Sequence, residues 1–130
     1  MTNKAPMSND QTGVAAAKRE YDLEERTARF GESIIGFAKQ IPKNPVTLSL
    51  ISQVVRAGTS IGANYCEVDE AATNKEFKHR ISLCKRESKE TKFQIRMIVA
   101  AEPQLKEQGR ILWQEAKELT RIFASILRKK

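Results

Sequence analysis

The residues best suited to bind a ligand form a row of cations between residues 74 and 101. Spacings of three, four and seven place these side chains in one exposed sector of an α-helix, with the acids of the segment on the flanks. They are Lys78, Lys85, Arg86, Lys89, Lys92 and Arg96. Cations gathered along one line can neutralise successive phosphates and release their counterions. Phe93 shares the sector and offers a flat surface on which a base could stack.

This pattern predicts a non-enzymatic protein that binds nucleic acid, and RNA is the expected form. The basic C-terminal residues 128–130 would assist. Binding through phosphates should be strongly salt-dependent and weakly sequence-selective. Two other interpretations stay open. The cations could form an ordinary solvated face with some i, i+4 pairing to glutamates, or they could meet the acidic surface of a protein recruited by an oligomeric scaffold without nucleic acid.

Residues for catalysis or metal binding are scarce. The chain has one histidine, His79, which falls among the cations and is expected to be solvated rather than a general base. The acids of residues 67–70 follow no EF-hand pattern, and no Glu-x-x-His pair of the di-iron type occurs. No glycine-rich phosphate loop precedes a lysine. We therefore expect no catalytic site, no metal and no cofactor.

Composition limits the class of protein. A chain of 130 residues with 30% charged and 6% aromatic side chains suits one helical domain. Its formal charge of +7 favours contact with nucleic acid, acidic protein or anionic membrane without choosing among them. The two cysteines, Cys66 and Cys84, imply neither a disulfide framework nor a metal site. With no long apolar run and no signal-peptide layout, we expect a cytoplasmic protein that spans no membrane.

Four amphipathic segments must position these residues. Apolar or small side chains alternate at spacings of three and four in helices expected over about 21–40, 45–66, 74–101 and 104–127. The first stripe is Leu23, Thr27, Phe30, Ile34, Phe37 and Ile41. The second is Leu48, Ile51, Val55, Gly58, Gly62 and Tyr65, widened by Val54 and Ile61. The third is Phe77, Ile81, Cys84, Ser88, Thr91, Ile95 and Ile98. The fourth is Leu105, Gly109, Leu112, Ala116, Leu119, Phe123 and Ile126.

Capping residues set the expected helix ends. Asn44 is a good N-cap with Pro45 at the first helical position, and Thr73 with Glu76 forms a capping box. Residues 1–20 are predicted to be a flexible tail, although 14–17 could extend the first helix when packed. The rest, 21–130, is predicted to be an all-α, antiparallel up-down-up-down four-helix bundle.

Several apolar side chains lie off the four stripes. They are Ile35, Val54, Leu83, Met97, Ile111, Trp113, Ile122 and Leu127. Some of them widen the core. If the others cluster on the surface, they form a patch that calls for a partner, and identical subunits are the commonest partner. The sequence therefore also predicts self-association.

The segment from Val55 to Thr91 carries a family resemblance. The run Arg-Ala-Gly-Thr-Ser-Ile-Gly-Ala-Asn-Tyr at 56–65, then Glu67, Phe77, the Arg-Glu pair at 86–87 and the Glu-Thr pair at 90–91 resemble the four helix bundle protein family. Its members are also called 23S rRNA-intervening-sequence proteins, since some are encoded within inserts in bacterial rRNA genes. The likeness covers about residues 26–127. This sequence departs from the family pattern at Gln94 and Val68, where an aromatic residue and a glycine are usual.

The resemblance implies a bacterial protein whose antiparallel bundle assembles as a ring-shaped homopentamer. A related branch, the accessory variability proteins of diversity-generating retroelements, forms basic pentamers that bind nucleic acid and a reverse transcriptase. No motif in this chain places it in that branch, so a reverse transcriptase is an expected partner only if it belongs there.

The resemblance also marks six polar positions, for which we predict a structural network between the second and third helices. They are Arg56, Ser60, Asn64, Glu67, Glu87 and Glu90. Arg56 with Glu87 or Glu90 is the expected ion pair. Its expected role is to fix the register of the two helices.

Overall fold

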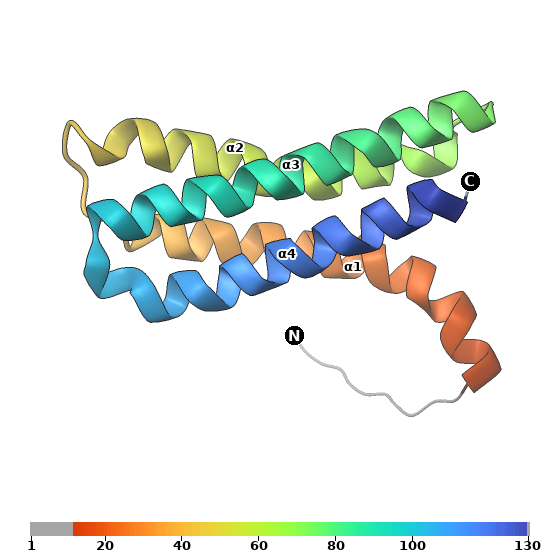
Figure 1. Ribbon diagram of the computed structural model, residues 1–130, viewed down its shortest axis with the longest axis horizontal. Helices are drawn as coiled ribbons and strands as arrows, with labels where there is room; N and C mark the ends of the chain where they lie inside the picture. The colour runs from red at the N-terminus through yellow and green to blue at the C-terminus, as the bar shows by residue number, and fades with distance from the viewer. Residues whose placement is uncertain (1–11, 130) are drawn as a thin grey trace.

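The computed structural model describes the backbone of residues 12–129 and the side chains of residues 23–129. This part of the chain forms four helices: α1 (Thr12–Lys39), α2 (Thr47–Cys66), α3 (Asn74–Ala101) and α4 (Lys106–Lys129). Two short 3₁₀ turns, η1 (Val68–Glu70) and η2 (Pro103–Leu105), precede α3 and α4, and no strand occurs between residues 12 and 129. The chain turns back at each of the three connections (Figure 1).

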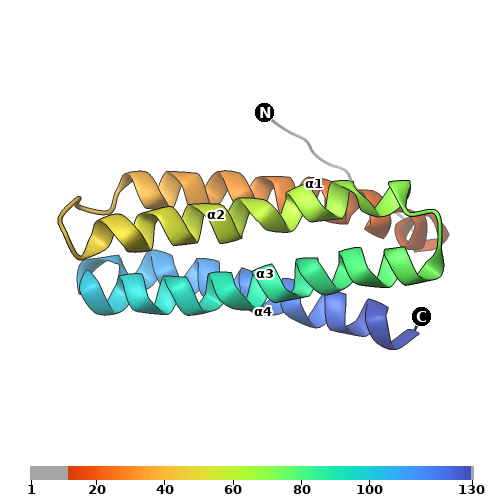
Figure 2. The same ribbon diagram turned by 90° about the horizontal axis from the view of Figure 1, so that it is seen from above.

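The helices lie in two layers, α1 with α2 and α3 with α4 (Figure 2). Each helix packs along its length against the next one in the chain, whereas α1 and α4 touch much less. The α1–α4 side of the bundle is therefore its most open side. The α3–α4 pair lies side by side in both views, which matters for the basic residues of α3 (Figures 1 and 2).

The predicted stripes of α1, α3 and α4 form the core. The first buried set runs from Leu23 in α1 to Ile41 just after it, as expected, and in α3 the buried stripe lies between Ile81 and Ile98. The apolar core is completed by α4, where Ala116, Leu119 and Phe123 have no exposed surface.

The stripe predicted for α2 is confirmed in part. Gly58 is buried, as are Val54 and Ile61, which were expected to widen the stripe. Leu48, placed inside by the sequence pattern, is 54% exposed, while Ala57, outside the predicted stripe, is fully buried. At Gly58 α1 approaches closely, since an added Cβ atom would lie 2.8 Å from Ile34 Cγ1, and glycine lets this α1 side chain rest on the α2 backbone.

Helix ends follow the predicted caps with small differences. The Asn44 Oδ1 atom accepts hydrogen bonds from the N–H groups of Val46 (2.9 Å) and Thr47 (3.0 Å). Thr73 Oγ1 accepts from Glu76 N–H, but the Glu76 carboxylate accepts from Ala72 N–H instead of Thr73. The start of α1 differs more, because residues 12–20, predicted as tail, are helical. Residues 1–11 lie outside the described part.

The two cysteines have opposite environments, and we expect opposite reactivity. Cys66 is exposed, whereas Cys84 is fully buried and burial raises the pKa of its thiol to about 12. Because only the thiolate reacts, iodoacetamide at pH 8 should add to Cys66 alone in the folded protein and to both cysteines in urea. Mass spectrometry reads the number of adducts. Two adducts on the folded chain, or any adduct on folded Cys66→Ser, would contradict the burial of Cys84.

Candidate nucleic-acid interface

The six predicted cations lie along the outer side of α3, and we call them the basic face. Arg86, Lys89 and Arg96 are exposed, while Lys78, Lys85 and Lys92 are half-buried, and Lys92 lies toward α4. Among the described residues, Arg86 is the one cation of this face with an ion pair, a 3.7 Å contact to Glu87 Oε2 that leaves its side chain 69% exposed. The others have no carboxylate partner within the described residues.

The adjacent helix α4 extends this face with an aromatic ring. Trp113 is half-buried, and two ammonium groups lie over its ring: Lys92 Nζ at 5.2 Å and Lys117 Nζ at 5.5 Å from the centroid. The sequence analysis did not place Trp113 or Lys117 in the site. Their i, i+4 spacing puts them on one side of a helix, but only the rotation of α4 against α3 brings that side next to Lys92.

The acids near the basic face are held on its other flank, toward α2. Arg56 donates to Glu87 Oε1 (3.2 Å) and to Glu90 Oε2 (2.6 Å), so it bonds both carboxylates expected for it. The Glu87 side chain is only 7% exposed. The hydrogen bond to Glu90 raises the pKa of the Arg56 guanidinium, which stays charged. These carboxylates are thereby directed away from Lys85, Lys89 and the α4 side.

The remaining marked positions join this network only in part. Asn64 Oδ1 accepts a 3.4 Å hydrogen bond from Arg80 Nη1 on α3, a partner that the sequence analysis missed. The Ser60 hydroxyl donates to the Arg56 carbonyl of its own helix, so it does not reach α3. Glu67 lies at the C-cap of α2, where its exposed side chain makes no bond to the network among the described residues. The observed inter-helix network is therefore smaller than predicted.

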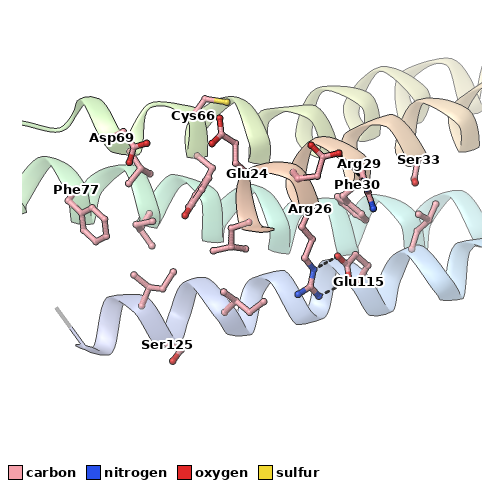
Figure 3. A pocket seen from close by; sticks show the side chains of 18 of the residues that line it. Glu24, Arg26, Arg29, Phe30, Ser33, Cys66, Asp69, Phe77, Glu115 and Ser125 are labelled. Atoms are coloured by element: carbon pink, nitrogen blue, oxygen red, sulfur yellow. Dashed lines mark hydrogen bonds and ion pairs between the residues drawn. The ribbon is translucent and has the colours of Figure 1, made fainter. Parts of the chain in front are cut away.

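A groove of about 1720 Å³ opens on the other side of α4, between α1 and α4 (Figure 3). Arg26 on α1 crosses it and donates two hydrogen bonds to Glu115 on α4, at 2.6 and 2.9 Å. Phe30 and Phe77 are among its lining residues, together with aliphatic side chains. None of the six predicted cations lines this groove, so the basic face is a separate surface.

The described residues offer little to support catalysis or metal binding. No group of three His, Cys, Asp or Glu side chains lies close enough to hold a metal ion in the described part. His79 is exposed on α3 and is absent from the groove lining. None of the helices between residues 12 and 129 is both long and apolar enough to cross a membrane.

Comparisons with known proteins agree with this architecture. The family model described as 23S rRNA-intervening sequence protein matches residues 19–125. A crystal structure of a protein of unknown function from the S23 ribosomal protein family of Bacteroides thetaiotaomicron superposes with a TM-score of 0.77 at 22% identity, covering 85% of this chain and 98% of the other. At that identity the likeness shows the fold alone. A comparison with curated proteins found no match. The chain belongs to the 23S rRNA-intervening sequence protein family, as its resemblance from Val55 to Thr91 indicated.

Proposed function

We propose that this protein is a non-enzymatic, cytoplasmic nucleic-acid-binding protein whose ligand is RNA. The observation that supports this most is the charge arrangement of α3. Lys85, Lys89 and Arg96 present cations without carboxylate partners in the described structure, while Arg56 occupies the nearby acids Glu87 and Glu90. A net charge of +7 adds a long-range attraction for polyanions.

A charge-reversal pair tests this function. Lys85→Glu/Lys89→Glu should weaken RNA binding about tenfold at 0.1 M salt, because two phosphate contacts are lost and two repulsions are added. The matched control is Lys39→Glu/Lys43→Glu, since these two lysines are exposed near the C-terminal end of α1 and the net charge changes equally. Fluorescence anisotropy with a labelled 20-mer RNA measures both, at several salt concentrations.

The control variant should bind within about twofold of the parent, and the slope of log affinity against log salt should become shallower only in the α3 variant. Equal losses in both variants would mean that net charge alone drives binding. Unchanged binding in both, or affinity that ignores salt, would contradict the basic face as the site.

We further propose that the four helices, whose chain turns back at each connection, form an antiparallel bundle that assembles into a ring-shaped homo-oligomer. Exposed apolar side chains on α1, on α2 and before α2 support self-association: Ile35 is 44%, Val46 66% and Leu48 54% exposed.

Native mass spectrometry with and without nuclease tests this assembly, and a pentamer is expected to persist after nuclease. A monomer under both conditions would contradict the assembly. A protein partner that remains bound after nuclease would instead favour the scaffold alternative.

A further inference from the structure

Two aromatic rings lie among the cations of α3 and α4: Phe93 on the exposed side of α3, and Trp113 on α4 beside Lys92. Phe93 is 56% exposed, and no ring or cation contact involves it among the described residues. It follows Lys92, with Lys89 four residues before it and Arg96 three residues after it, so the three lie on the same side of α3. Lys92, the residue before Phe93 in the chain, lies over the Trp113 ring on α4. We call this set, with Lys117, the α3–α4 surface.

An exposed ring among cations is poorly suited to a duplex. In paired nucleic acid the base faces are already stacked inside the helix, and side chains cannot read the deep, narrow major groove of A-form RNA. Cations alone would suffice to hold such a backbone. Unpaired bases, in contrast, can leave the strand axis and stack on an aromatic ring while the adjacent phosphates meet lysine and arginine.

We propose that the α3–α4 surface binds single-stranded nucleic acid, with Phe93 and Trp113 stacking on unpaired bases and the flanking cations contacting phosphates. This deepens the proposed function and rests on it. The cations are Lys89, Lys92, Arg96 and Lys117. Side chains three or four residues apart on α3 lie about 5–6 Å apart, which gives an extended strand a close series of positive charges.

The two ammonium groups over Trp113 are compatible with stacking. Cation–π contacts at partly exposed sites are weaker than the stack of a base on an aromatic ring. Lys92 and Lys117 have long, flexible side chains, so either ammonium can leave the ring for the phosphate of the nucleotide whose base replaces it. In the free protein the lysines cover the ring, and in the complex they would neutralise the strand.

Trp113 makes this proposal directly measurable because it is the only tryptophan in the chain. The full-length protein is titrated with a 20-mer oligouridylate while its tryptophan fluorescence is recorded. Parallel titrations use oligothymidylate, an RNA duplex of the same length, and heparin, a polyanion without bases. We expect both single strands to quench the fluorescence, with the duplex and heparin binding without comparable quenching. Tighter binding of oligouridylate would identify RNA as the ligand, and equal affinity would indicate either single strand.

Variants separate stacking from charge, with anisotropy of labelled oligonucleotides as the readout. Phe93→Leu and Trp113→Leu should each weaken single-strand binding about tenfold. Neither should change heparin binding. Trp113→Phe, which keeps a ring, should restore most of the affinity. Ile111→Ala is the matched control, since it removes a 61% exposed apolar side chain from the groove side of α4, away from the α3–α4 surface, and it should leave oligonucleotide and heparin binding unchanged.

The outcomes distinguish this proposal from the proposed function. Equal affinity for duplex and single strand, with Phe93→Leu unchanged and Lys85→Glu/Lys89→Glu weakened, would overturn stacking but keep the polyanion surface. Heparin binding as strong as oligouridylate, with equal loss in the leucine variants, would also overturn it. Absence of binding to every oligonucleotide and to heparin would overturn both. Far-UV circular dichroism confirms that each variant keeps its helical fold.

Discussion

Replacing Gly58 by alanine should lower the free energy of unfolding by about 2 kcal/mol, the usual range for overpacking a tight core. The new Cβ atom would lie 2.8 and 2.9 Å from the two γ-carbons of Ile34 and 3.1 Å from its Cβ. These atoms are next to the α1 backbone, and Ile34 is fully buried, so the side chain cannot turn away. Alanine must therefore push α1 from α2, which outweighs its better helix propensity.

Gly36→Ala is the matched control because Gly36 is also helical but a Cβ there meets nothing within 4 Å. It should raise stability by about 0.5–1 kcal/mol through helix propensity alone. Urea denaturation followed by circular dichroism, at one fixed protein concentration, measures both changes. The double variant Gly58→Ala/Ile34→Ala should lose less stability than the sum of the losses of the two single variants, since the clash is removed. A stabilised Gly58→Ala variant would disprove the close approach of the two helices.

Strong apolar periodicity made most of the fold predictable. The bounds of α3, Asn74–Ala101, agree with the sequence analysis because a capping threonine and Pro103 mark its two ends. Buried hydroxyl residues were also placed correctly by spacing, and the structure shows how they are tolerated. The side-chain hydroxyl groups of Thr27, Ser88 and Thr91 donate hydrogen bonds to carbonyls of their own helices, so each of the three buried groups has a partner.

The errors come from features that hydrophobicity does not report. On α2 the pattern placed Leu48 inside, although it is 54% exposed, and left out the fully buried Ala57, because alanine carries too little hydrophobicity to mark a core face. The start of α1 at Thr12 lies in a segment without a sustained apolar period, so the helix could not be extended from pattern alone.

The candidate site was predictable on one helix and not across two. Cation spacing along α3 follows from the helical repeat, so the basic face could be listed from sequence. The position of Trp113 beside Lys92 depends on the relative rotation and offset of α3 and α4, which are set by core packing. One such packing contact is Gly109, where an added Cβ would lie 2.6 Å from Val99 Cγ2 on α3. A surface site shared by two helices can therefore be identified only from the three-dimensional structure.

Replacing Arg56 by methionine should lower the free energy of unfolding by about 2 kcal/mol. The change removes the nearer guanidinium from the Glu87 carboxylate, which is 7% exposed, and leaves it only the 3.7 Å contact with the exposed Arg86. A fully buried ion pair would lose more, but Arg56 is 45% and Glu90 34% exposed, so water compensates in part. Methionine keeps the apolar stem of the side chain, so the main change is the loss of the guanidinium with its charge and its hydrogen bonds. Thermal and urea unfolding measure the loss.

The comparison variant Arg29→Met removes an i, i+4 ion pair to Glu25 in which both side chains are 64% exposed. It should change stability by at most about 0.5 kcal/mol. In the cycle of Arg56→Met, Glu87→Gln and their double variant, neutralising Glu87 should recover part of the loss, because the buried charge that lost its nearer partner is gone. Recovery would show that Arg56 compensates Glu87 across the two helices. If Arg56→Met and Arg29→Met lose equally little and the cycle is additive, the network does not fix the register of α2 against α3, and the Glu87 carboxylate must reach water instead.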